Sequence, residues 1–222
     1  MGQETPAQNP SRAGDWLARP SVAALYAVTT LLIASAAARA VYRAHTDRMR
    51  STTGAAEWIW YSSRILEPRP LRFIATREFE LPVSPAAARA KLFVDREHAL
   101  YVNGERVGSG IQARGDPLAI YEIAPHLRAG VNRLAIEAAS PTGIGGILFS
   151  LDVDGYGRDA LVSDGRWRVD LAREAILRGG RFVPRVWGRP PQFPWGYPRM
   201  PRPEETEGLE SQVSSLRSGS RN

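Results

Sequence analysis

The chain has 222 residues, 43% of them hydrophobic, and no cysteine, so it can form one domain with flanking tails but no disulfide framework, thiolate metal site or cysteine nucleophile. Its formal net charge of +6 arises in the flanks, because residues 171–202 hold seven arginines and one glutamate, whereas residues 57–170 hold 14 basic and 15 acidic residues. A nucleic-acid-binding domain carries its basic residues on the folded face itself, so we expect no nucleic-acid partner.

The N-terminal region predicts a tail followed by a membrane helix. Residues 1–20 are polar and contain three prolines, which favours disorder. Residues 21–38 are uncharged and rich in alanine, and the run extends to Tyr42 if Arg39 snorkels, which gives the roughly 20 residues that cross a membrane. No polar face interrupts the run, which argues against a soluble amphipathic helix. We therefore predict a transmembrane or signal-anchor helix over 21–42 and a linker over 43–56, with a cleaved signal peptide as the alternative.

The charges beside this helix bear on its orientation. Four arginines, from Arg39 to Arg50, follow the uncharged run 21–38 and two precede it, so the positive-inside rule would place the C-terminal domain in the cytoplasm. Long C-terminal domains can translocate past such charges. We expect a single-pass membrane protein of the bacterial cell envelope with its C-terminal domain exported, an orientation that the flanking charges contest.

From Glu57 to Asp170 the sequence is typical of an all-β protein. Lys91–Gly108 is the clearest hairpin, because Asn103-Gly104 supplies the two positive-φ residues of a type I′ turn. Apolar residues recur with a period of two, and turn residues follow about every ten positions. The pattern predicts an antiparallel β-sandwich or jelly roll over 57–170. The further strands are expected at 57–61, 72–81, 119–123, 132–139, 147–153, 160–162 and 167–169.

Several motifs follow one another in the order found in a known family. They are Trp58-Ile59-Trp60, Phe79-Glu80-Leu81-Pro82, Leu100–Gly108, Tyr121-Glu122-Ile123, Leu127–Glu137 and Val162–Trp167. Together they resemble the N-terminal galactose-binding-like domain of bacterial α-L-rhamnosidases, and the jelly-roll domain of some β-galactosidases is similar. The resemblance covers 57–170 and implies a carbohydrate-binding-like β-sandwich. The helical barrel that carries rhamnosidase catalysis does not follow, so we expect no enzyme.

The region after Asp170 differs in composition. Residues 171–177 favour a short helix that ends at Gly179-Gly180. Residues 181–203 are rich in proline, arginine and aromatic residues, which excludes a regular helix or a central strand. We predict a basic Pro/aromatic-rich extension over 171–203 and a disordered tail over 204–222.

Candidate binding residues come from two loops and from this extension. Sugar-binding modules place a few polar side chains beside an aromatic face. The loops 95–97 and 112–116 supply carboxylates and arginines, and the tryptophans of the extension supply aromatic rings. The candidate ligand-binding residues are Asp95, Glu97, Arg114, Asp116, Trp187 and Trp195. Solvated turns and tryptophans packed back on the sandwich are the structural alternatives.

Catalytic and metal sites are not indicated. A glycosidase needs two carboxylates across a cleft, and Asp152 and Asp154 instead fall on the outward face of one strand, where a charge is simply solvated. The three histidines are scattered, so we expect no transition-metal site and no cofactor. Calcium is the one ion left open, through loop oxygens of Asp95, Asp116, Asp152 and Asp154.

The sequence therefore favours a non-catalytic carbohydrate-binding or accessory module, tethered at the cell envelope by its N-terminal helix, with a glycan or envelope polysaccharide as partner. The alternative is a membrane-anchored interaction module that docks on a membrane glycosyltransferase or transporter without binding free sugar.

Overall fold

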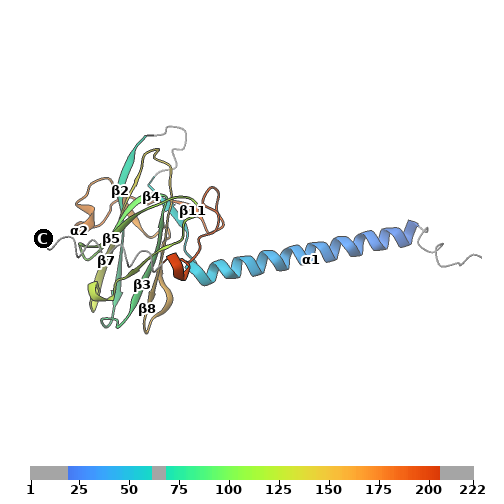
Figure 1. Ribbon diagram of the computed structural model, residues 1–222, viewed down its shortest axis with the longest axis horizontal. Helices are drawn as coiled ribbons and strands as arrows, with labels where there is room; N and C mark the ends of the chain where they lie inside the picture. The colour runs from blue at the N-terminus through green and yellow to red at the C-terminus, as the bar shows by residue number, and fades with distance from the viewer. Residues whose placement is uncertain (1–19, 62–68, 206–222) are drawn as a thin grey trace, which may run out of the picture. The chain divides into compact units, whose positions relative to one another are not determined.

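The computed structural model describes residues 20–61 and 69–205. The chain divides into two units, 1–47 and 48–222, each of which is described by itself. The folded elements of the second unit form a sandwich of two sheets (Figure 1).

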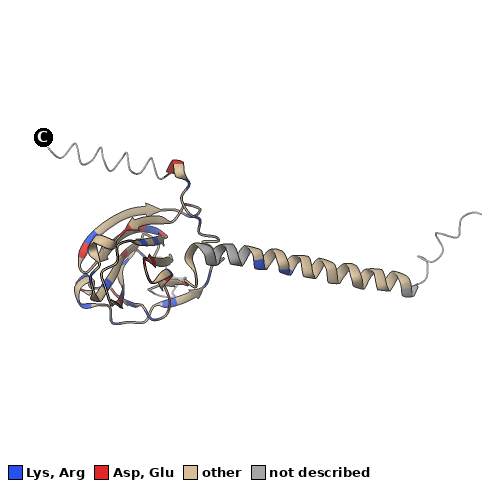
Figure 2. Ribbon diagram, turned by 90° about the horizontal axis from the view of Figure 1, so that it is seen from below, with Lys and Arg blue, Asp and Glu red and all other residues tan. Residues whose placement is uncertain are grey.

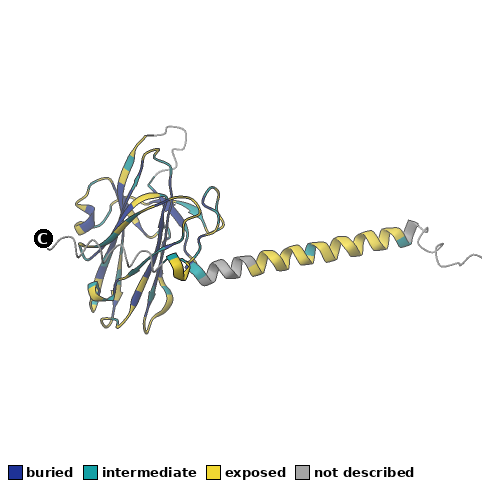
Figure 3. Cartoon of the chain, in the orientation of Figure 1, coloured by how far each residue is buried: buried dark blue, intermediate teal, exposed yellow. Residues whose placement is uncertain are grey.

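The first unit holds most of helix α1 (Pro20–Thr53), which ends in the second unit. Within it, Val22–Ala44 is long and apolar enough to cross a membrane, and its side chains are almost all exposed (Figure 3). The helix continues through most of the stretch predicted as a linker. It ends where Gly54 adopts a φ of 58°, the left-handed conformation that commonly terminates helices.

The sandwich contains two antiparallel sheets. Sheet A has the order β11-β1-β8-β3-β6, with β9 also paired to β8, and sheet B has the order β10-β2-β7-β4-β5. The strands are β1 (Trp58–Trp60), β2 (Leu71–Leu81), β3 (Ala88–Val94), β4 (Arg96–Val102), β5 (Glu105–Gln112), β6 (Ala119–Glu122), β7 (Gly130–Ser140), β8 (Ile147–Val153), β9 (Gly157–Val162), β10 (Arg168–Asp170) and β11 (Arg185–Gly188). A 3₁₀ turn, η1 (Ala124–His126), follows β6, and a short helix, α2 (Ala175–Arg178), lies beside sheet B. The all-β sandwich with an N-terminal helix, predicted from the sequence, is confirmed.

The core lies between the sheets and follows the alternation of side chains along each strand. In β4, Leu100 and Val102 point inward and are fully buried, whereas Tyr101 packs on the outer face against α2. Trp60 and Trp167 are also buried between the sheets. The period of two that the sequence shows is therefore followed in β4, because the alternation of side chains between two faces is a local property of a strand.

The turn Asn103-Gly104 has φ values of 53° and 87°, as a type I′ turn requires. We expect Gly104→Ala to lower the free energy of unfolding by about 1–2 kcal/mol, because an L residue is strained at this φ. The added Cβ would also lie 2.6 Å from the Leu177 side chain. Gly165→Ala is the matched control, since its Cβ would meet only an ordinary 3.6 Å contact. Calorimetric unfolding that is equal for both variants would refute the role of the turn.

The folded unit continues past Asp170, where the sequence predicted the sandwich to end. Strand β11 pairs with β1 at the edge of sheet A, a position compatible with neighbouring prolines. Arg181 binds the buried Asp170 carboxylate, with Nε 2.7 Å from Oδ2. The hydrogen bonds from Arg181 and from the Ala172 backbone hold the pKa of Asp170 at about 2. The extension is thus tied to the sandwich by a strand and by an ion pair.

Charge on the folded unit is mixed. Basic and acidic residues are interspersed over the sandwich (Figure 2). In α1 the stretch 22–38 carries no charged residue, and arginines occur only from residue 39 onward.

Candidate functional site

A cleft of about 630 Å³ lies on the outer face of sheet B. Strands β4 and β7 supply its floor, with β2 and β5 at the sides and Arg173 of the turn before α2 at the rim. The alternation along β4 points Glu97, Ala99 and Tyr101 to this face. Ala99 pairs with Glu137 in the neighbouring strand, and its small side chain leaves the floor hollow between larger polar groups.

The polar groups of the cleft are linked in a chain. Arg72 donates one hydrogen bond to Glu137 (Nη1 to Oε1, 2.9 Å) and another to Glu97 (Nη2 to Oε2, 3.2 Å). The Tyr101 hydroxyl donates to the second oxygen of Glu137 at 3.0 Å. Burial alone would raise the pKa of Glu137, but the bonds from Arg72 and Tyr101 outweigh it and lower that pKa. A contact with Tyr101, aided by the charge of Glu137, raises the pKa of Arg173.

This arrangement suits binding better than glycosidic catalysis. A glycosidase acid must keep its proton near neutral pH, which requires a raised pKa. The pKa of Glu137 moves the other way, and Arg72 binds both carboxylates of the cleft. The cleft instead offers fixed hydrogen-bonding groups around a hollow floor, which is how small polar ligands are oriented.

Behind the edge strand β5, the buried ring of His98 meets the partly buried ring of Tyr121. His98 Nε2 lies 2.7 Å from the Tyr121 hydroxyl oxygen, and His98 is only 4% exposed. Burial lowers the pKa of His98 to about 4 and raises that of Tyr121 to about 12. Glycine at Gly108 permits this packing, because a Cβ there would lie 2.3 Å from the tyrosine ring.

The buried His98 makes the fold sensitive to acid. The pKa of His98 is lower in the folded chain than its ordinary value of 6.5, so the unfolded chain takes up the proton first as the pH falls. The stability that the neutral His98 gives to the fold is therefore complete above pH 6.5 and is lost as the pH falls toward 4. We expect a loss of about 3 kcal/mol across that range. In the variant His98→Gln, the side chain can still bond to Tyr121 but does not titrate. The free energy of unfolding of this variant should therefore fall less steeply as the pH decreases. Urea unfolding at pH 7 and pH 4.5 measures the difference, and an unchanged slope would contradict the assignment.

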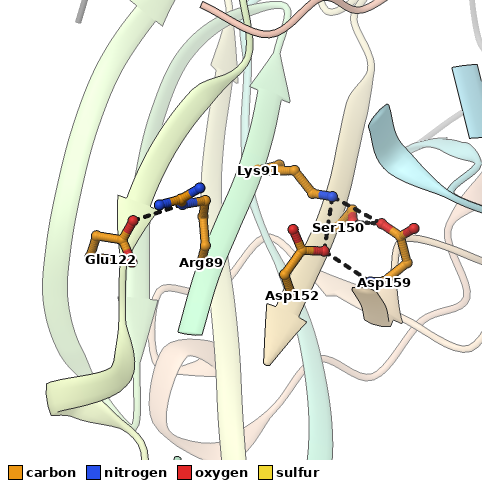
Figure 4. Close-up of polar contacts among 6 residues, drawn as sticks. All are labelled: Arg89, Lys91, Glu122, Ser150, Asp152 and Asp159. Carbon is orange, nitrogen blue, oxygen red and sulfur yellow. Dashed lines mark hydrogen bonds and ion pairs between the residues drawn. The ribbon is translucent and has the colours of Figure 1, made fainter. Parts of the chain in front are cut away.

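A second polar cluster lies on the outer face of sheet A (Figure 4). Lys91 is the only lysine of the chain and is 3% exposed. Its ammonium binds Asp152 Oδ1 at 2.9 Å and Asp159 Oδ1 at 3.1 Å. Ser150 donates to Asp159, and the Asp159 backbone N–H donates to Asp152. Asp152 is therefore engaged in an ion pair and is not the solvated strand residue that the sequence predicted.

Two of the aspartates considered for calcium, Asp95 and Asp152, lie near opposite ends of β8. Asp95 follows Val94, which pairs with Ile147 at the start of β8, whereas Asp152 lies near the other end of that strand. Across residues 20–61 and 69–205, no group of three or more acidic or histidine side chains is placed to hold a metal ion.

The six predicted ligand residues fall into two places. Glu97 alone lines the cleft on sheet B. The other five lie where the loop 112–118 meets the extension. Trp195 is 7% exposed, stacks on Trp58 at 4.8 Å and donates its indole N–H to Asp95 at 2.9 Å. Arg114 lies 5.9 Å from the ring of Phe193, Asp116 accepts from the Ala113 N–H of its own turn, and Trp187 lies 6.4 Å from Trp195.

Asp95 and Trp195 thus pair with each other in a part-buried contact. Ligand binding by all six residues stays a prediction. The sequence reasoning missed the remaining polar residues of the cleft because it searched loops rather than strand faces. The outward polar positions of β2, β4 and β7 were the available signal: Arg72, Tyr101 and Glu137.

Comparisons with known proteins place the fold. No family model matches the chain, and no curated protein matches it. Among solved structures, an α-L-rhamnosidase from Streptomyces avermitilis, solved in complex with L-rhamnose, matches with 20% identity and a TM-score of 0.56, over 67% of this chain and 16% of that one. The lectin from Pleurotus ostreatus in complex with GalNAc matches with 21% identity and a TM-score of 0.55, over 66% of this chain and 47% of the lectin. A family GH78 rhamnosidase of Bacillus sp. GL1 matches with 22% identity and a TM-score of 0.56, over 65% of this chain and 19% of that one.

The sandwich therefore has the galactose-binding-like fold that the sequence motifs indicated. At these identities the likeness concerns the fold alone. The chain spans about a sixth of the first rhamnosidase, so it resembles one part of that enzyme.

Proposed function

We propose that this protein is a non-catalytic carbohydrate-binding module that holds a saccharide in the cleft on the outer face of sheet B. The observation that carries the proposal is the cleft itself, where Arg72, Glu97 and Glu137 form a fixed polar network around a hollow floor. The likeness in fold to a lectin that was crystallised with GalNAc supports it.

Saccharide binding by the full chain, in detergent micelles on a glycan array, tests the proposal. Arg72→Gln and Glu97→Gln should each weaken retention, because both side chains are more than half exposed and reach into the cleft. Arg89→Gln is the matched control, since Arg89 forms an ion pair of similar exposure with Glu122 on the other sheet. Retention that is lost equally in all three variants, or binding to no glycan, would sink the proposal.

We further propose that α1 tethers the module to a cell-envelope membrane, with the sandwich exported. The segment Val22–Ala44 supports the tether by its length and composition. A reporter fused after Asn222 that is active only outside the cytoplasm tests the orientation. A cytoplasmic result would overturn the export and, with it, binding to an exported glycan.

One observation favours the alternative of a docking module for a membrane protein. Phe193 is 82% exposed beside Arg114, so its ring is accessible to a partner protein. A defined membrane protein that co-purifies with the full chain but not with Phe193→Ala, together with no glycan retention, would support this alternative.

A further inference from the structure

The hydrogen-bonding capacity left open in the sheet-B cleft is dominated by donors. Both oxygens of Glu137 already accept hydrogen bonds, from Arg72 and Tyr101, and one oxygen of Glu97 accepts a bond from Arg72. Among the described residues, Arg106 makes no hydrogen bond or ion pair, and it is exposed at the edge of the cleft. A carboxylate oxygen can accept a second hydrogen bond, but the three guanidinium groups of the cleft leave more unused N–H donors than its two carboxylates leave unused acceptor sites. An oxyanion only accepts, so it matches this excess of donors better than a neutral sugar hydroxyl, which both donates and accepts.

Two guanidinium groups adjoin the same ring. Arg106 on β5 is the register partner of Tyr101, and Arg173 contacts the Tyr101 hydroxyl from the turn before α2. With Arg72, three guanidinium groups and two carboxylates line the cleft, which leaves one positive charge in excess. Guanidinium groups bind oxyanions through two parallel N–H donors, a geometry that lysine lacks.

We propose that the cleft is specific for a saccharide with an anionic substituent, whose oxyanion binds Arg106 and Arg173. The inference rests on the proposed function, since it names the class of sugar that the same cleft takes. The Arg72–Glu137–Tyr101 network forms the floor under the sugar ring. Arg106 and Arg173 then select the charged group through their guanidinium N–H donors.

Binding of defined tetrasaccharides to the full chain in micelles, measured by calorimetry, tests this inference. One charged probe is tetragalacturonate, which carries carboxylates, and its neutral counterpart is its methyl ester. The other charged probe is a sulfated galactotetraose, and its neutral counterpart is the unsulfated galactotetraose. We expect at least one charged probe to bind about tenfold more tightly than its neutral counterpart. The preferred probe assigns the oxyanion as carboxylate or sulfate.

Variants distinguish binding in the cleft from the non-specific attraction of an anion to a basic protein. Arg106→Gln and Arg173→Gln should each lower the affinity for the charged probe about tenfold and lower the affinity for the neutral probe much less. Arg189→Gln is the control, because Arg189 is exposed in the basic extension and does not line the cleft. Neutral probes that bind as tightly as the charged ones would overturn the inference while the proposed function stands. Failure of every probe, and of the glycan array, would overturn both.

Discussion

Replacing Trp195 by alanine should lower the free energy of unfolding by about 3–5 kcal/mol, the usual cost of deleting a buried aromatic side chain. Trp195 is 7% exposed and stacks on Trp58 in a cluster with Phe93 and Leu148 on the outer face of sheet A. Its loss would also leave the Asp95 carboxylate without its indole donor. Calorimetric unfolding of the full chain in micelles measures the change.

Phe193→Ala is the matched control for this prediction. Phe193 lies two residues earlier in the same segment but is 82% exposed, so its loss should change the unfolding free energy by less than about 0.5 kcal/mol. If Trp195→Ala were as mild as Phe193→Ala, this part of the extension would not belong to the folded unit.

Replacing Lys91 by methionine should cost about 3–5 kcal/mol, because it removes the cation from a buried ion pair and leaves two carboxylates facing each other. The Lys91 ammonium lies within 3.1 Å of both Asp152 and Asp159. Methionine keeps the length of the side chain, so the change reports charge more than volume. Urea unfolding of the unchanged protein and of Lys91→Met measures this difference in the free energy of unfolding.

Two companion variants sharpen this test. Arg89 lies two residues before Lys91 on the same strand. The variant Arg89→Met breaks only the exposed ion pair with Glu122, so it should lower the free energy of unfolding by no more than about 1 kcal/mol. Adding Asp159→Asn to Lys91→Met removes one of the facing charges, and asparagine tolerates the φ of 55° at this position. The double variant should therefore be more stable than Lys91→Met. A double variant that is less stable would show that repulsion between the carboxylates is not the cause.

The sequence predicted what is local and missed what depends on distant contacts. The Asn103-Gly104 turn and the inward faces of β4 follow from residues next to one another, so the hairpin could be located. Asp95 and Trp195 are 100 residues apart, and nothing in either segment indicates that they meet. An aromatic residue between prolines therefore looked exposed, although the outer face of sheet A buries it.

The cleft was harder to foresee for a related reason. Arg72, Glu97 and Glu137 are outward residues of three different strands. In the sequence, each of them has the pattern of an ordinary solvated charge. They form one network only because β2, β7 and β4 are neighbours in sheet B, with Ile74 opposite Glu137 and Glu137 opposite Ala99. Strand order, which one sequence does not specify, creates the site.

The pairing of β11 with β1 has a consequence for how the protein is made. The first strand of the sandwich lies between β8 and the last strand, β11, which forms the edge of sheet A, and Trp195 stacks on Trp58. On the ribosome, β1 can pair with β8 first, but its second edge must wait for residues 185–195 to emerge, and contacts so distant in sequence slow folding. A nascent chain that stops before this point would expose Trp58 and an unpaired strand edge, which is the kind of surface that chaperones and proteases recognise.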